Sequence, residues 1–286
     1  MCDDDIHQGL IEDTSLSRRT FGLMGAAVAG LAATAAGAAT SVVEKDVEVK
    51  TADGVADAAL YHPEGKGSWP AVVIWTDVVG LRPVFREMGR RLAASGYVVL
   101  VPNPYYRVKR APVVEGGFNF ANPDDRAKLA LLRPAVTADG TARDAAAFIT
   151  YLDGLPQTDR KKKVGTQGYC MGGPLAFYTA GAVPGRVGAV ASFHGGGLYT
   201  EAANSPHLTL AKTHAEYLVL IADNDDKKEP AVKDQLKAAF AEAKRPAKVE
   251  VYAAGHGWTV KGGQVYDEAL AEKAWAELLA LYKRSL

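Results

Sequence analysis

One short stretch restricts what this chain can fold into more than any other: a cysteine set among glycines. It reads Gly168-Tyr169-Cys170-Met171-Gly172-Gly173. The run before it, 163–167, has the pattern of a strand, and the run after it, 174–180, that of a helix. Glycines are needed where a turn is tight and neighbouring backbone comes close. The pattern therefore predicts a strained strand-to-helix turn that presents Cys170, with a buried structural cysteine as the alternative.

Cysteine usage adds to the case for a reactive thiol. The chain has two cysteines, Cys2 and Cys170, and Cys2 lies in a segment that we expect to be removed. The mature protein would then carry a single thiol and no internal disulfide. The N–H groups at the start of a helix after Cys170 favour a thiolate over a thiol.

The first forty residues have the features of a targeting segment. The twin-arginine form is Ser17-Arg18-Arg19-Thr20-Phe21-Gly22-Leu23. A mildly apolar run, 23–39, follows, and Ala36-Gly37-Ala38 supplies a small-residue cleavage pattern. We expect 1–40 to be a twin-arginine signal peptide read by the twin-arginine export machinery, which places the protein in the periplasm or otherwise outside the cytoplasm. The alternative is a transmembrane anchor; after processing we expect no stable membrane span.

Residues 41–286 are long enough for one large α/β domain. The formal net charge is +0, and basic residues form no stripe with interleaved aromatics, so we expect no nucleic-acid partner. The runs 43–49 and 56–61 predict an antiparallel hairpin at a sheet edge, with a turn at Asp53-Gly54. A continuously apolar run, 71–75, then a helix across 81–92, then a strand at 97–101 form a βαβ unit, which implies a parallel sheet.

The rest of the chain continues the alternation after one interruption. Segment 102–140 is rich in proline, glycine and aromatic residues, with a short helix near 124–132. We interpret it as a lid-like excursion over the site or as a plain surface excursion. The later elements are helices at 141–152 and 231–243, strands at 187–193, 217–221 and 248–252, and a final helix with Tyr266, Leu270, Ala274, Leu278 and Tyr282 on one face.

Three chemically active positions follow three of the predicted strands. Cys170, the acidic cluster 223–226 and His256 all fall at carboxyl ends, where open α/β sheets bind ligands. Their order along the chain is nucleophile, acid, histidine. This arrangement predicts a catalytic triad.

These residues resemble those of the dienelactone hydrolase family, a branch of the α/β-hydrolases. The likeness rests on the Cys170 turn, the Asp-bearing loop and Gly255-His256-Gly257-Trp258, with a further matching stretch at 90–102, and spans about residues 45 to 284. It implies a single α/β-hydrolase domain with a mostly parallel central sheet and helices on both faces. It also implies hydrolysis of small esters or lactones by a Cys-Asp-His triad without a cofactor.

The resemblance implies a role for each matching residue. Cys170 attacks the carbonyl, His256 moves the proton, and Asp225 fits best as the acid, with Asp223 and Asp226 as competitors. The oxyanion would be held by the backbone N–H groups of Met171 and Val78. The residues expected at the substrate are Asp77, Arg107, His194 and Trp258.

Two departures from the family pattern concern the substrate. The family has Glu where this chain has Asp77, beside the nucleophile. Dienelactone-specific members also hold the substrate carboxylate with two arginines; Arg107 matches the first, but Val260 stands at the second, and the adjacent Lys261 is no bidentate donor. His194 is expected to line the pocket or to bond the backbone. No residue spacing resembles a metal site.

The sequence therefore supports three hypotheses. The first is a hydrolase of a small ester or lactone that works through a thioester acyl-enzyme. The second keeps the fold but acts as a general carboxylesterase or thioesterase. The third is a non-catalytic binding protein on the same fold, for which an unreactive Cys170 would be the sign.

Overall fold

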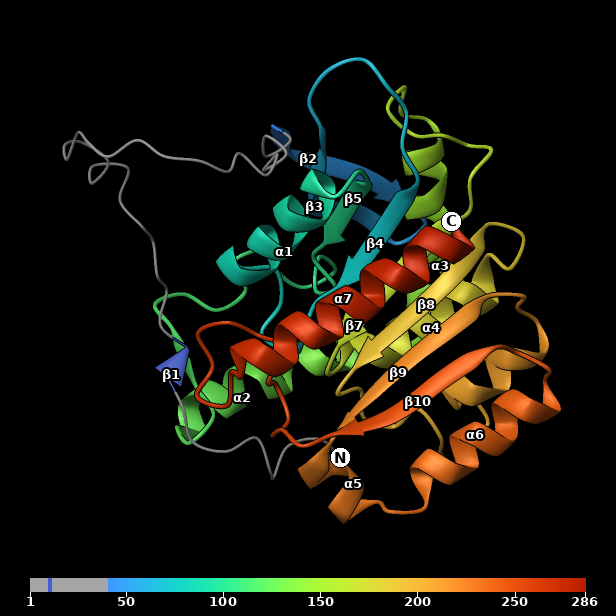
Figure 1. The fold of residues 1–286 in the computed structure, drawn as a ribbon. Helices are drawn as coiled ribbons and strands as arrows, with labels where there is room; N and C mark the ends of the chain where they lie inside the picture. Colours follow the sequence, from blue (N-terminus) through green and yellow to red (C-terminus); the bar gives the residue numbers. More distant parts are fainter. Residues whose placement is uncertain (1–9, 12–40) are drawn as a thin grey trace, which may run out of the picture.

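The computed structural model describes residues 10–11 and 41–286, which form an α/β domain around one large sheet (Figure 1). The predicted signal peptide lies almost entirely outside the described residues. Within it, only β1 (Leu10–Ile11) is described, and it pairs antiparallel with β6 (Phe118–Asn119).

The central sheet has eight strands in the order β10-β9-β8-β7-β4-β5-β3-β2. The strands are β2 (Val42–Thr51), β3 (Gly54–Pro63), β4 (Ala71–Trp75), β5 (Val98–Pro102), β7 (Val164–Tyr169), β8 (Val187–Phe193), β9 (Glu216–Ala222) and β10 (Ala247–Tyr252). The β2–β3 and β3–β5 pairs are antiparallel and all others are parallel. The predicted edge hairpin and mostly parallel sheet are confirmed.

The second strand of the hairpin is less exposed than its sequence pattern indicates. Residues 56–63 of β3 are all buried, because β3 lies between β2 and β5 and its inner residues are small. Of the two hairpin strands only β2 lies at an edge of the sheet, and it has the charged, half-exposed pattern typical of an edge.

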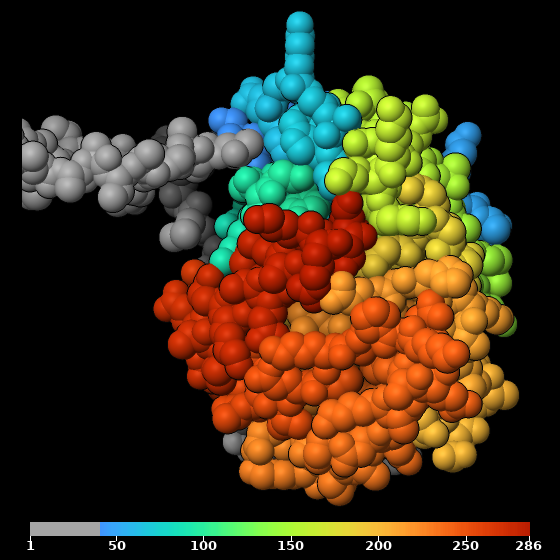
Figure 2. All heavy atoms as spheres, turned by 45° about the vertical axis from the view of Figure 1, so that its right-hand side comes forward, coloured from blue at the N-terminus to red at the C-terminus, as the bar shows by residue number. Residues whose placement is uncertain are grey.

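Helices cover both faces of the sheet, as predicted. One face carries α1 (Pro83–Ala94) and α7 (Glu268–Ser285), which contribute Phe85, Leu92 and Leu278 to one core. The other carries α3 (Ala138–Asp153), α4 (Gly172–Ala182) and α6 (Val232–Glu242), with a 3-10 turn, η2 (Pro206–Ala211), beside α4. Figure 2 shows α7, in red, on the surface next to the α1 segment.

Capping residues explain where several helices begin. The Thr137 hydroxyl accepts from Gly140 N–H at the start of α3, and the Asp267 carboxylate accepts from Leu270 N–H at the start of α7. The last helix therefore begins after Tyr266, and not at it as its periodicity indicates. At the end of β9 the acidic cluster is not a loop: it forms a short helix, α5 (Asp223–Lys228).

The excursion between β5 and α3 contains α2 (Pro123–Leu132) and a 3-10 turn, η1 (Arg133–Ala135). Its first part is fixed by the buried Asp57, which accepts from Asn103 Nδ2 at 3.0 Å and from Ala111 N–H at 2.8 Å. Its role as a lid stays a prediction.

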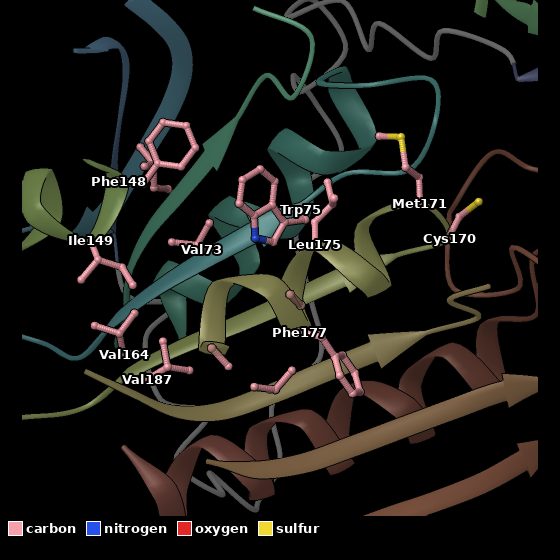
Figure 3. Packing of buried hydrophobic residues seen from close by; sticks show 14 of the residues in the cluster. Val73, Trp75, Phe148, Ile149, Val164, Cys170, Met171, Leu175, Phe177 and Val187 are labelled. Atoms are coloured by element: carbon pink, nitrogen blue, oxygen red, sulfur yellow. The ribbon is translucent and has the colours of Figure 1, made fainter. Parts of the chain in front are cut away.

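A buried polar chain supports the strand that leads to Cys170. Tyr282 Oη, on α7, donates to Gln167 Oε1 at 3.0 Å, and Gln167 Nε2 donates to Tyr169 Oη at 2.7 Å. A Cβ on Gly165 would lie 2.8 Å from the Tyr282 ring, so a glycine is needed where α7 crosses β7. Figure 3 shows Cys170 and Met171 between the end of β7 and α4, at one end of the apolar cluster that also holds Trp75 and Phe177.

Candidate active site

Cys170 occupies a strained turn between β7 and α4. Its φ of 51° lies in the left-handed region, which is unfavourable for a residue with a Cβ. A Cβ on Gly168 would lie 1.8 Å from the carbonyl oxygen of Gly172, and one on Gly172 would lie 2.4 Å from that of Trp75. Both glycines are required by close backbone contacts, as predicted. Cys170 itself is almost fully buried.

The acid and the histidine are in direct contact. His256 Nδ1 lies 2.7 Å from Asp225 Oδ2. Because a carboxylate only accepts, Nδ1 carries the proton, which leaves Nε2 for another partner. Nε2 is buried and makes no hydrogen bond of regular geometry within the described part of the chain. The backbone N–H of His256 donates to Asn224 Oδ1 at 2.8 Å, and Asp223 N–H donates to the Ala254 carbonyl oxygen at 3.0 Å, so three bonds join the histidine loop to α5.

The other two acids of the cluster have different partners. Asp223 pairs with Lys227 within α5, and Asp226 pairs with Lys233 at 2.9 Å. Asp225 is thus the one carboxylate of the three that contacts His256, and its role as the acid of a triad stays a prediction.

The surroundings of His256 favour its protonated form. Burial alone would lower the pKa of the imidazole, since a buried cation loses its hydration. The charge of Cys170 and the hydrogen bond with Asp225 outweigh this cost, and the pKa of His256 is raised well above its ordinary value. A cationic His256 next to Cys170 is the partner that a thiolate requires.

Two backbone N–H groups are available near the nucleophile. Met171 caps the N-terminus of α4, and Val78 lies in the loop after β4. Neither N–H has a hydrogen-bond partner among the residues that the structure describes. Both residues are buried, and Tyr105 joins them: its hydroxyl lies 2.7 Å from the Val78 carbonyl oxygen and 3.3 Å from Met171 Sδ. This pair of donors is suited to a developing oxyanion.

Asp77 has contacts other than those that the resemblance implies. Its carboxylate accepts from Arg82 Nη1 at 2.6 Å, from Arg82 Nη2 at 2.7 Å and from Val79 N–H at 3.0 Å. Both side chains of the ion pair are almost buried, with 12% and 10% of their surfaces exposed. Both carboxylate oxygens are therefore engaged in the loop after β4, and no bond to Cys170 is found in the described residues.

Arg107 likewise forms a structural contact. Its guanidinium donates to both oxygens of Asp144, on α3, at 2.8 Å and to Asp53, at the hairpin turn, at 2.6 Å. It also lies over the Tyr106 ring. Two carboxylates neutralise its charge, so these contacts do not support the predicted role as a substrate ligand.

His194 and Trp258 form a buried ring cluster next to His256. The His194 ring meets the His256 ring edge-on at 4.7 Å and the Trp258 ring at 5.3 Å. His194 Nε2 is 3.0 Å from Thr259 Oγ1, and burial lowers the pKa of His194 well below its ordinary value, so this second imidazole is neutral. Trp258 is fully buried. His194 therefore lies between the rings of His256 and Trp258, and neither His194 nor Trp258 is among the residues that line the pocket described below.

A pocket of about 360 Å³ lies beside Asp225 and His256. Asp225 and His256 form part of its wall, and the glycines 195–197 after β8 form another part. Its apolar surface comes from Leu198, Ile221, Val232 and Leu236.

Three residues of the site were not predicted from the sequence: Arg82, Tyr105 and Asn224. Arg82 follows Asp77 by five residues. This short spacing between a carboxylate and a basic residue is the one sequence signal that could have indicated the ion pair between them. Tyr105 contacts a loop far away in sequence, and Asn224 adjoins the triad acid without any pattern of its own.

Within residues 41–286, no group of three or more His, Cys, Asp or Glu side chains is arranged to hold a metal ion. None of the helices in this part of the chain combines the length and the apolar character that a membrane crossing needs.

Comparison with known proteins agrees with the geometry. A carboxymethylenebutenolidase of Rhodococcus opacus is 25% identical over 234 residues, which cover 79% of this chain and 86% of that protein. A Klebsiella pneumoniae protein whose name places it among the dienelactone hydrolases has a TM-score of 0.73 at 20% identity, over 85% of this chain and 99% of that one. The dienelactone hydrolase-like promiscuous phosphotriesterase P91, from metagenomic libraries, has a TM-score of 0.65 at 23% identity, over 85% and 98%. The model of the dienelactone hydrolase family matches residues 56–286, and this chain belongs to that family.

Proposed function

We propose that this protein hydrolyses a small carboxylic ester or lactone through a thioester on Cys170. The observation that carries the proposal is the 2.7 Å contact between His256 Nδ1 and Asp225 Oδ2 in a site where the charge of Cys170 raises the pKa of the same imidazole. A histidine oriented by a carboxylate and paired with a cysteine has the arrangement of a nucleophilic triad.

In the first half of the reaction the Cys170 thiolate attacks the carbonyl carbon. A carbon–sulfur bond forms, and the carbonyl π electrons move to the oxygen, which accepts the N–H groups of Met171 and Val78. The intermediate collapses when the carbon–oxygen bond to the alcohol breaks. The leaving oxygen takes the proton from His256 Nε2, and the acyl group stays on sulfur.

The second half releases the acid. Water attacks the thioester carbon and gives one proton to His256, which Asp225 keeps oriented. The carbon–sulfur bond then breaks, the carboxylic acid leaves and the thiolate–imidazolium pair is restored.

An uncharged substrate fits this site better than an anionic one. Val260 stands where dienelactone-specific members place a second arginine, and Arg107 is neutralised by Asp53 and Asp144. General carboxylester or thioester hydrolysis is the second form of the proposal, and a non-catalytic binding role is the outcome if no substrate reacts.

The test compares wild type, Cys170→Ala and Cys170→Ser on a panel of p-nitrophenyl acetate, a butenolide lactone, dienelactone and an acyl thioester. We expect wild type to hydrolyse at least one neutral member and Cys170→Ala to lose about a thousandfold or more in kcat/KM. Full activity in Cys170→Ala contradicts the mechanism. No hydrolysis, with iodoacetamide alkylation of Cys170 only above the ordinary thiol pKa of about 8.5, supports the binding protein.

We further propose that the chain is exported by the twin-arginine route, on the basis of Arg18-Arg19 and the apolar run that follows. Expression of the full chain in a bacterium with this export system is expected to deliver shortened protein to the periplasm. The double substitution Arg18→Lys and Arg19→Lys is expected to retain it in the cytoplasm; periplasmic delivery of that variant contradicts the proposal.

A further inference from the structure

His194 contacts three residues of the loop that carries His256. Its ring meets the His256 ring edge-on, with the centroids 4.7 Å apart, and the Trp258 ring at 5.3 Å. Its Nε2 lies 3.0 Å from Thr259 Oγ1. Residues 256–259 follow β10, whereas His194 follows β8, and β9 lies between these two strands in the sheet. One side chain therefore joins the end of β8 to the loop after β10.

The backbone of His194 is strained, and its neighbours hold it in place. Its φ of 42° lies in the left-handed region, which a residue with a Cβ rarely adopts. Its N–H donates to the Leu220 carbonyl oxygen of β9 at 2.8 Å, and the residue is buried. Strain of this kind persists where the surrounding contacts over-determine a conformation, and it is concentrated at functional sites. His194 therefore has a fixed backbone, and packing restricts the movement of its ring.

The bond with Asp225 alone does not fix the plane of the His256 ring. Asp225 Oδ2 holds Nδ1 at 2.7 Å, and Asn224 Oδ1 holds the backbone N–H at 2.8 Å. An imidazole with one side-chain hydrogen bond can still tilt about that bond. Such a tilt moves Nε2, the atom that faces Cys170 in the proposed reaction. The ring of His194, packed edge-on at 4.7 Å, limits this motion because it is itself closely packed.

The charges around the two histidines suit a neutral His194. Burial and the nearby charge of His256 lower the pKa of His194 well below its ordinary value. The Tyr169 ring, 6.2 Å away, is also uncharged, because burial raises the pKa of its hydroxyl. The charges that favour the cation on His256 come from Cys170 and Asp225. His194 therefore packs against the imidazolium without repelling it.

We propose, on the basis of the proposed hydrolytic function, that His194 is a positioning residue whose ring keeps His256 Nε2 directed at Cys170. The Thr259 hydroxyl fixes the His194 ring, and the His194 ring limits the tilt of His256. His194 takes no part in the proton transfers. It is buried and is not among the residues that line the pocket, so its effect is on the chemical step and not on substrate binding.

The first test removes either the ring of His194 or only its bond, and measures hydrolysis of the neutral ester that wild type cleaves best. We expect His194→Ala to lower kcat by about tenfold to a hundredfold, with KM changed by less than about threefold. His194→Phe and Thr259→Val keep the ring of residue 194 and remove only the bond, so each is expected to lower kcat by about threefold to tenfold. The double variant is expected to lose no more than His194→Phe alone, because both changes break the same bond.

The control is His62→Phe, which removes the 2.8 Å contact between another buried imidazole and the Pro63 carbonyl oxygen. His62 adjoins Tyr61, which pairs with Val99 near the start of β5, so it lies away from the carboxyl ends of the parallel strands. We expect lower stability in this variant, with kcat within about twofold of wild type.

Thermal unfolding establishes that each variant is folded. If His194→Ala does not fold, His194→Phe and Thr259→Val decide the question. A lower Tm with unchanged kcat in the His194 variants, as expected for His62→Phe, would show that His194 is only structural and would overturn the proposal.

A readout that needs no substrate separates this inference from the proposed function. Iodoacetamide alkylates the Cys170 thiolate. The ratio of its rates at about pH 6.5 and about pH 9.5 reports how far His256 supports that thiolate below the ordinary thiol pKa of about 8.5. We expect this ratio to fall about tenfold or more in His194→Ala and to stay within about twofold of wild type in His62→Phe.

The two proposals fail in different ways. If wild type hydrolyses no ester, the proposed function fails, and the alkylation ratio alone decides the role of His194. If hydrolysis requires Cys170 but the His194 variants change neither kcat nor the alkylation ratio, the function stands and the positioning role fails.

Discussion

Both terminal nitrogens of Arg82 hold the carboxylate of Asp77, at 2.6 and 2.7 Å, in a loop that precedes α1. The same carboxylate accepts the Val79 N–H, and the Tyr105 hydroxyl bonds the Val78 carbonyl. The Val78–Val79 peptide is thus held on both sides, while the Val78 N–H is left for a ligand. In this chain Asp77 and Tyr105 fix the loop that carries the Val78 N–H, which we propose as an oxyanion donor.

Breaking this pair is expected to cost stability. In Asp77→Asn the almost buried Arg82 keeps its charge without a counterion, and we expect the free energy of unfolding to fall by about 3 kcal/mol. The control is Asp46→Asn, whose carboxylate pairs with Arg86 but is 76% exposed, so a loss of about 0–1 kcal/mol is expected. Urea unfolding measures both; equal losses would show that burial of the Asp77 pair has no energetic effect.

Removal of the Tyr105 hydroxyl is expected to affect turnover as well as stability. Tyr105→Phe leaves the buried Val78 carbonyl without its partner, which costs about 1–3 kcal/mol. Because the loop then holds Val78 N–H less firmly, we expect kcat to fall while KM changes little. Tyr178→Phe removes an exposed hydroxyl bond to the Asn204 carbonyl and serves as control. A purely structural role predicts lower stability with kcat unchanged.

Replacement of the triad acid is expected to change a titration. Asp225 raises the pKa of His256, so Asp225→Asn is expected to lower that pKa, which NMR of the imidazole Cε1 measures. The pKa of His256 is higher in the folded state than in the unfolded state, where it is about 6.5. The raised pKa stabilises the fold fully at pH values below about 6.5, and this contribution is lost as the pH rises through the folded-state pKa. The stability difference between wild type and Asp225→Asn is therefore expected to be largest at acidic pH. A His256 titration that does not move in the variant contradicts the pairing.

The glycines of the nucleophile turn offer a steric test. In Gly168→Ala the new Cβ would lie 1.8 Å from a backbone oxygen, which no side-chain movement relieves, so we expect a loss of about 4 kcal/mol or more, or insoluble protein. At Gly185 no atom lies within 4 Å of the added Cβ, and Gly185→Ala is expected to change stability by less than about 1 kcal/mol. Soluble expression and thermal unfolding distinguish the two variants.

The sequence predicts those features of the fold and of the site that depend on a local residue pattern or on hydrophobic periodicity. The apolar run 71–75, the Gly168–Gly173 turn and the order of Cys170, Asp225 and His256 follow from pattern and chain order, and the structure brings Asp225 and His256 together. The burial of β3 could not be predicted, since it depends on its two neighbouring strands.

Contacts between side chains that lie far apart in the sequence could not be predicted either. The role assigned to Arg107 followed its position in the family pattern, but its guanidinium meets Asp144, 37 residues away, and Asp53, 54 residues away. Asp77 was expected beside the sulfur because the chain position matches. The arginine at position 82, which the family resemblance did not include, provides the competing partner.

The helix that supports β7 is the last described element to be synthesised. Tyr282 reaches Gln167 across 115 residues of sequence, and α7 follows every other described element. A growing chain that has just passed residue 256 already contains Cys170, Asp225 and His256 and both strands that pair with β7, yet it still lacks the Tyr282 hydroxyl that bonds Gln167. Synthesis therefore delivers Cys170, Asp225 and His256 before the helix whose tyrosine supports the strand that leads to Cys170.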